Sequence, residues 1–198
     1  MGDKAITLED IDAIVGITPS AAPQSASIDN PINEDMPQLA SLRSKFEKAS
    51  KYSGIPVEVL AGVASRESRA GRFLNKEGYD KEKKAYGVMQ IDERFHKLKG
   101  KSPDSQEHIN QAAYILAANK KIVDKKYPAW TEEQRMQGAV AAYNMGIGNV
   151  RTWKNLDKGT TGGDYSADVM LRAKAYKSLT NASNKKDTKG IQNVNYRP

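Results

Sequence analysis

The 198 residues are enough for one domain with an ordinary buried core, and too few for two once the polar ends are set aside. Apolar residues make up 38% and charged residues 28%, a globular balance, and no stretch approaches the ~18 consecutive apolar residues of a membrane span. The absence of cysteine excludes disulfides and thiol chemistry, while the net charge of +7 favours an anionic partner such as bacterial wall polymer, nucleic acid or acidic membrane.

Residues 1–37 are predicted to be an N-terminal extension. The opening MGDKAITLED carries early acidic residues and lacks the basic start and apolar run of a secretory signal, and Ile6 stands where a myristoylation pattern has Ser or Thr. The apolar spacing over 6–15 suits a brief helix, and residues 16–37, rich in Pro, Ser, Ala and Asn, are typical of a linker. Nothing in the segment directs export, so the compartment stays open, a cytoplasmic one included.

Residues 38–180 have the pattern of a helical domain. Apolar residues recur at helical spacing over 39–49 and again after Pro56, which suits a first helical position. A longer helix is expected over about 104–126, ended by Pro128. These helices form the first part of the expected core.

Two further helices follow. Thr131 opens the sequence T-E-E-Q, a capping box in which Gln134 reaches back to the cap. The last helix is expected to carry Tyr165, Val169, Ala173 and Tyr176 on one face. From Asn181 to residue 198 the composition again resembles a linker, which predicts a polar C-terminal tail; its Asn-Ala-Ser matches a glycosylation acceptor but recurs by chance.

One segment, about 75–92, has β character. Gly78 and Gly87 break the helical pattern there, which favours a short hairpin. Within it, AYGVMQID alternates apolar and polar residues, a pattern typical of a half-buried strand that presents Gln90 and Asp92 to one side. The predicted fold class is therefore mainly α, an α+β arrangement with a small hairpin.

Acid–base chemistry in this chain would fall to carboxylates, because cysteine is absent and there are two histidines, His96 and His108. Among 24 acidic residues, Glu67 stands out because it follows an apolar helical stretch and sits among small residues, in GVASRESRAG. The edge of an apolar core raises the pKa of a glutamate toward the range useful for protonating a leaving group. The competing interpretation is a surface glutamate paired with Arg66 or Arg69, and the residues alone leave both open.

Other patterns argue against bound groups. Gly146 and Gly148 in AYNMGIGNV suit a helix end and turn, since the third glycine and the preceding strand of a dinucleotide loop are missing. The histidines lack the spacing of metal ligands. Neither a metal nor a cofactor is expected.

Six motifs occur in an order that resembles the goose-type lysozymes over about residues 40–178: SRESRAG, YGVMQID, HI at 108–109, YPAW, AAYNMGIGNVR and DKGTTGGDYSADVMLRAKAYK. The resemblance implies a lysozyme-like fold with a small hairpin beside a substrate cleft. It also implies peptidoglycan as substrate, cleaved at the β-1,4 bond between N-acetylmuramic acid and N-acetylglucosamine, in antibacterial defence or bacterial digestion outside cells or in phagosomes. A monomer is expected.

The same resemblance implies residue roles. Glu67 matches the family's proton donor, and Asp92 matches an aspartate thought to hold the attacking water. Asp80 matches a second such aspartate, although the alignment there needs about one inserted residue and the usual Asn-Gly-Trp-Gly run is NKEGY. The expected cleft residues are Gln90, His96, Tyr143 and Asn144. The family's inverting mechanism implies a separation of ~6.5–9.5 Å between Glu67 and each aspartate, whereas a retaining enzyme needs ~5–5.5 Å.

Two alternatives remain at this stage. A lytic transglycosylase shares the fold and the glutamate but closes an anhydro ring, which does not need the aspartate pair. A non-catalytic wall-binding protein would not need Glu67 beside Asp92. Nucleic-acid binding is disfavoured because basic residues are not clustered with aromatic ones. The family's avian members carry disulfides near the N-terminus, and this chain resembles instead its cysteine-free members from fish.

Overall fold

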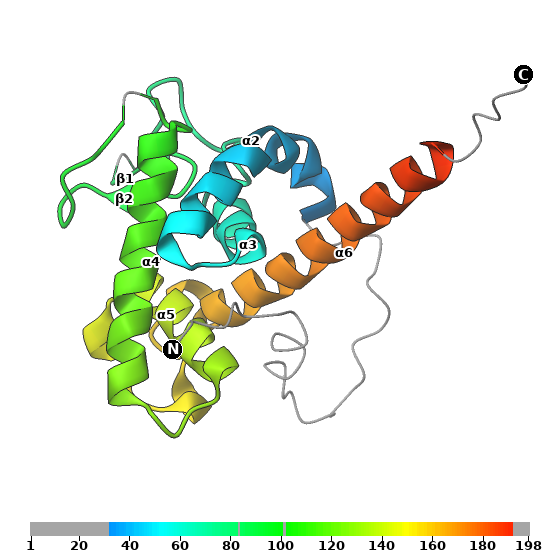
Figure 1. Ribbon diagram of the computed structural model, residues 1–198. Helices are drawn as coiled ribbons and strands as arrows, with labels where there is room; N and C mark the ends of the chain where they lie inside the picture. The colour runs from blue at the N-terminus through cyan, green and yellow to red at the C-terminus, as the bar shows by residue number, and fades with distance from the viewer. Residues whose placement is uncertain (1–31, 83, 101, 192–198) are drawn as a thin grey trace, which may run out of the picture.

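The computed structural model describes residues 32–82, 84–100 and 102–191, with side chains described as far as residue 183 (Figure 1). The helices in this part of the chain are α2 (Ile32–Ser53), α3 (Val57–Ser68), α4 (Gln106–Lys126), α5 (Glu132–Met145) and α6 (Tyr165–Ile191). Two short strands, β1 (Ala85–Tyr86) and β2 (Ile91–Asp92), pair antiparallel, with Ala85 opposite Asp92. Short 3-10 helices cover 147–149, 153–155 and 161–163. The mainly α fold with a small hairpin is as the sequence predicts.

The central element is α3, which packs against both α2 and α6, while α4 packs against α2 and α5. In Figure 1, α4 runs along one side of the domain and the C-terminal part of α6 projects away from it. Gly62 allows α3 and α6 to approach closely, because a Cβ there would lie 2.6 Å from the carbonyl oxygen of Val169. This close crossing brings the start of α6 beside the end of α3. The core includes the fully buried Phe46, Leu60 and Leu116.

The sequence locates the helix starts well where a cap marks them. Thr131 and Gln134 form the expected capping box, with Gln134 N to Thr131 Oγ1 at 3.2 Å and Thr131 N to Gln134 Oε1 at 2.9 Å. Pro56 occupies the N-cap position of α3, one residue before the first helical position that the sequence predicted for it, and α4 ends at Lys126, two residues before Pro128. Local sequence therefore determines these boundaries.

The ends of the domain differ from the sequence prediction. Helix α2 begins at Ile32, inside the expected linker, because Ile32 and Asp35 are buried against the domain. Helix α6 continues through the expected tail to Ile191, since no proline interrupts it. The predicted short helix over 6–15 and the linker residues before 32 lie outside the described residues.

The AYGVMQID segment is a hairpin rather than the single half-buried strand that its alternation predicted. The chain turns at 87–90 because Gly87 and Gln90 both adopt positive φ angles, +75° and +50°. Val88 and Met89 are neighbours and both are buried, whereas in a half-buried strand neighbouring side chains would point to opposite faces. No helix in the described part of the chain is long and apolar enough to cross a membrane.

Candidate active site

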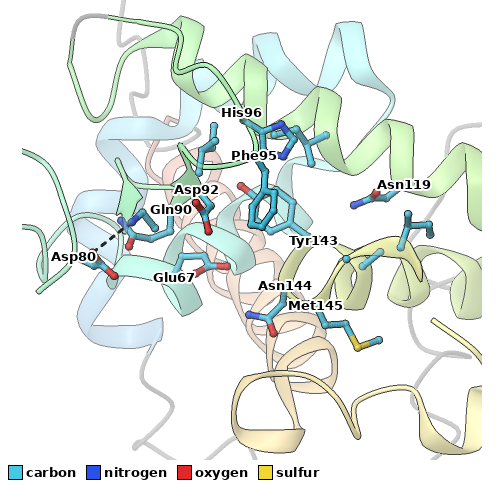
Figure 2. A pocket seen from close by; sticks show the side chains of 16 residues that line it. Glu67, Asp80, Gln90, Asp92, Phe95, His96, Asn119, Tyr143, Asn144 and Met145 are labelled. Atoms are coloured by element: carbon cyan, nitrogen blue, oxygen red, sulfur yellow. Dashed lines mark hydrogen bonds between the residues drawn. The ribbon is translucent and has the colours of Figure 1, made fainter. Parts of the chain in front are cut away.

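A cleft of about 780 Å³ opens between the hairpin, the ends of α3 and α5, and the middle of α4 (Figure 2). The seven site residues predicted from the sequence all line this cleft: Glu67, Asp80, Gln90, Asp92, His96, Tyr143 and Asn144. They come from four parts of the chain, and only the fold brings them together. Phe95, Ile115, Asn119 and Ile147 extend the lining beyond them.

Glu67 lies in the last turn of α3, where its partly buried side chain faces the cleft. The hydroxyl of Tyr165, at the start of α6, donates a hydrogen bond of 2.5 Å to Glu67 Oε1. Burial raises the pKa of Glu67 to about 7, although the hydrogen bond from Tyr165 and the positive charge of Arg66 act in the opposite direction. A glutamic acid in this state keeps its proton near neutral pH and can donate it.

The backbone after Glu67 is strained and held by side chains. Arg69 and Ala70 both have φ near +54°, in the left-handed region that non-glycine residues avoid. Ser68 donates its hydroxyl to Val88 O at 2.8 Å and accepts from Gly71 N at 2.8 Å. The turn that ends α3 is thereby joined to the hairpin.

The hairpin turn is held from three sides. Val88 N donates to Pro103 O at 2.8 Å, Met89 N to His108 Nε2 at 3.2 Å, and Tyr143 Oη donates to Met89 O at 2.7 Å. Nε2 of the buried His108 accepts a hydrogen bond here, so this nitrogen carries no proton and the ring is neutral. Burial also lowers the pKa of His108 to about 4. Gly87 is required because a Cβ there would lie 2.3 Å from His108 Nε2. These contacts fix the positions of Gln90 and Asp92 relative to Glu67.

Asp92 differs from Glu67 in its electrostatics. Arg94 donates from Nε to Asp92 Oδ1 at 2.9 Å and from Nη2 to Oδ2 at 2.5 Å. These hydrogen bonds are the main reason that the pKa of Asp92 is lowered, and its carboxylate is ionised at neutral pH. The cleft thus contains a carboxylic acid and a carboxylate.

Comparison with known proteins identifies the family. The family model described as Lysozyme g matches residues 23–180. Relatives named Lysozyme g include those of Casuarius casuarius (39% identical, covering 72% of this chain and 76% of the relative), Gallus gallus (43%; 72% and 67%) and Epinephelus coioides (41%; 74% and 79%).

The chain belongs to the lysozyme g family. The recognition made from six ordered motifs is therefore confirmed, and the chain is a member of a glycoside hydrolase family. Family membership does not by itself assign roles to the individual residues of the cleft.

Asp80, the second aspartate that the lysozyme g resemblance implied, lines the cleft on the same side as Glu67 and Gln90 (Figure 2). Its Oδ1 accepts from Lys84 N at 2.9 Å, which closes the loop ahead of β1. One oxygen is therefore occupied by the backbone. Asp80 lines the cleft even though the NKEGY run before it departs from the family's pattern.

The side chains of Asn144, Tyr143 and Gln90 make hydrogen bonds that hold the loops around the cleft. Asn144 accepts from Thr161 N at 2.9 Å through Oδ1 and donates to Thr161 Oγ1 at 3.3 Å through Nδ2. Its amide therefore holds the loop before α6, as the Tyr143 hydroxyl holds the hairpin. Gln90 donates from Nε2 to Gly87 O at 2.8 Å and also lines the cleft.

Sequence reasoning missed two residues that act on the carboxylates. Tyr165 was expected only as a core residue, yet its hydroxyl contacts Glu67 across 98 positions of the chain. Arg94 was not singled out, although a cation two residues after Asp92 is a visible signal. Among the described residues there is no group of three or more His, Cys, Asp or Glu side chains that could hold a metal ion.

Proposed function

We propose that this lysozyme g chain is a muramidase that cleaves the β-1,4 bond between N-acetylmuramic acid and N-acetylglucosamine in peptidoglycan, with Glu67 as general acid. The observation that carries the assignment is the pairing of a glutamic acid with a pKa of about 7 and an ionised Asp92 in one cleft. Glycoside hydrolysis needs both states, one group to give a proton and one to accept it.

In the proposed reaction, Glu67 gives its proton to the glycosidic oxygen as the bond from that oxygen to the sugar C1 breaks. A water molecule attacks C1 from the opposite face, and its proton passes to Asp92, with Asp80 helping to orient the water. Inversion of the anomeric configuration follows if the carboxylates are separated by ~6.5–9.5 Å. Gln90 and His96 are proposed to bind the hydroxyl and N-acetyl groups of the sugars.

The test is clearance of a Gram-positive wall suspension by the wild type and by Glu67→Gln, Asp92→Asn and Asp80→Asn. We expect Glu67→Gln to lose roughly a thousandfold in rate, since a general acid contributes on the order of 10²–10⁴. Glu47→Gln is the control, because Glu47 is an exposed carboxylate on α2, paired with Arg43 and outside the cleft. Wall clearance by Glu67→Gln at the wild-type rate would exclude this mechanism.

The products separate hydrolysis from the transglycosylase alternative. Mass spectrometry of released muropeptides should find reducing-end N-acetylmuramic acid, and NMR at early times should find the inverted anomer. An anhydro product would replace the hydrolase assignment with a lytic transglycosylase. Wall binding by the wild type without any product would instead indicate a non-catalytic binding protein.

A further inference from the structure

Phe95 is an aromatic side chain that the proposed chemistry does not use. It lines the cleft, yet 76% of its surface is exposed. Figure 2 shows its ring at the centre of the cleft, with Glu67 and Asp92 on one side and Asn119 on the other. Large apolar side chains that remain this exposed in a cleft are typical of a ligand-binding surface.

The Phe95 ring is held in place by the same residues that hold Asp92. Phe95 N donates to Asp92 O at 3.2 Å. The guanidinium of Arg94, which is bonded to the Asp92 carboxylate, lies over the Phe95 ring with its carbon 5.6 Å from the ring centre. Arg94 therefore covers one face of the ring, so a bound ligand would meet the other.

A pyranose ring suits such a platform. Its axial C–H groups form an apolar face, while its hydroxyl and N-acetyl groups project from the rim, where Asn119 offers an amide donor and acceptor. Ile115 and Ile147 add apolar surface to the lining of the cleft. The lining beyond the carboxylates thus combines an aromatic face with few polar groups, as expected for a sugar.

We propose that Phe95 is a further sugar-binding residue, which stacks on the C–H face of a pyranose next to the bond that is cut. The proposal rests on the proposed function, because it assumes that a glycan strand occupies this cleft. It makes Asp92, Arg94 and Phe95 one unit that positions a carboxylate and a sugar together.

The experiment measures binding separately from turnover. In a Glu67→Gln background, isothermal titration calorimetry with the hexamer of N-acetylglucosamine compares Phe95→Ala, Phe95→Tyr and Phe73→Ala. Phe73 is the matched control: 64% of its surface is exposed and Arg69 lies over its ring at 5.7 Å, but it lies outside the cleft lining. We expect Phe95→Ala to raise Kd roughly tenfold, as loss of one stacked ring implies, and Phe95→Tyr and Phe73→Ala to bind like the parent.

A second measurement tests whether Phe95→Ala weakens sugar binding without disturbing the folded active site. With Glu67 restored, Phe95→Ala should raise KM on soluble glycan and leave kcat within about threefold, the pattern of lost uniform binding. Equal hexamer binding by Phe95→Ala and the parent would overturn the proposal, as would equal weakening by Phe73→Ala. A wild type that binds the hexamer through Phe95 but does not cleave walls would refute the muramidase and leave Phe95 as a sugar-binding residue.

Discussion

Glu67 and Asp92 face the same cleft with opposite shifts in pKa. Burial disfavours the charge on Glu67, whereas hydrogen bonds from Arg94 favour the charge on Asp92. Two carboxylates of similar intrinsic acidity are thereby divided into an acid and a base, which is how environment assigns roles in such sites. The division has consequences for stability as well as for rate.

Glu67→Gln should make the folded protein more stable at high pH. The pKa of Glu67 in the fold, about 7, lies above its ordinary value of 4.5, so the unfolded chain loses this proton first and stability falls as pH rises through that window. Glutamine removes the cost of the buried charge. Urea unfolding should therefore give a gain of at most about 3 kcal/mol at pH 8 that vanishes at pH 4. A gain that does not change with pH would contradict this origin.

Tyr165→Phe should shift the pH dependence of catalysis. The hydrogen bond from Tyr165 stabilises the ionised form of Glu67, so its loss raises the pKa of Glu67 further and moves the alkaline limb of kcat/KM to higher pH. The rate at the optimum should fall roughly tenfold, since a hydrogen bond to a charged group also orients it.

The control for Tyr165→Phe is Tyr176→Phe on the same helix. The buried hydroxyl of Tyr176 has no hydrogen-bond partner within the described part of the structure, so its removal should leave the pH profile unchanged. A limb that moves to lower pH in Tyr165→Phe, or an equal shift in both variants, would show that the hydroxyl does not act on Glu67.

The family resemblance named seven of the residues that line the cleft, and five of them stand in the quoted motifs, while Asp80 and His96 lie outside those motifs. Their electrostatic states were not predictable in the same way. The pKa of Glu67 depends on packing of α3 against α6 and on a hydroxyl 98 residues away, and neither is encoded near Glu67. The resemblance could therefore name the acid, whereas local composition left a protonated glutamic acid and a surface ion pair both open.

At the scale of elements, sequence patterns predicted what is locally determined. The capping box of α5 and the apolar spacing of α3 and α4 are local, and they were right. The hairpin was predicted, but its turn was mistaken for strand because alternation carries no information on the sign of φ at Gln90. The start of α2 depends on the contacts of Asp35 with residues far along the chain.

Asp35 joins α2 to the strained end of α3. Its side chain, 0% exposed, accepts from Ser65 Oγ at 2.7 Å, from Arg69 Nε at 2.9 Å and from Arg72 Nη1 at 3.3 Å. Arg69 is the residue in the left-handed region two positions after Glu67. The ion pairs of α2 therefore help to hold the backbone that carries the proposed acid.

Asp35→Asn should lower the free energy of unfolding by about 2–4 kcal/mol, because it removes the only fully buried carboxylate that faces the mostly buried guanidinium of Arg69 among the described contacts. The matched control is Glu34→Gln. Glu34 also contacts Arg69 and Arg72, but its side chain is 66% exposed, so its loss should leave the urea midpoint unchanged. Equal effects of the two variants would show that the buried position of Asp35 is not what matters.

At the scale of the whole molecule, packing and ion pairs do what disulfides cannot do in a chain without cysteine. The close contact of α3 with α6 at Gly62 and the contacts of Asp35 with α3 both converge on the segment around Glu67. The stability of the fold and the geometry of the cleft therefore depend on the same contacts. The net charge, by contrast, belongs to the whole molecule and acts at longer range than any single contact.

The net charge of +7 should make activity on bacterial wall depend on salt. Long-range attraction to an anionic polymer is screened beyond ~8 Å at 0.15 M salt and beyond ~3 Å at 1 M, so wall clearance should fall severalfold between low and high ionic strength. Cleavage of an uncharged N-acetylglucosamine oligomer should change little, because the carboxylates of the cleft act at short range. Rates on both substrates, measured at matched pH across 0.02–1 M NaCl, test this. The same salt dependence for both substrates would place the effect in the cleft and not in attraction to the wall.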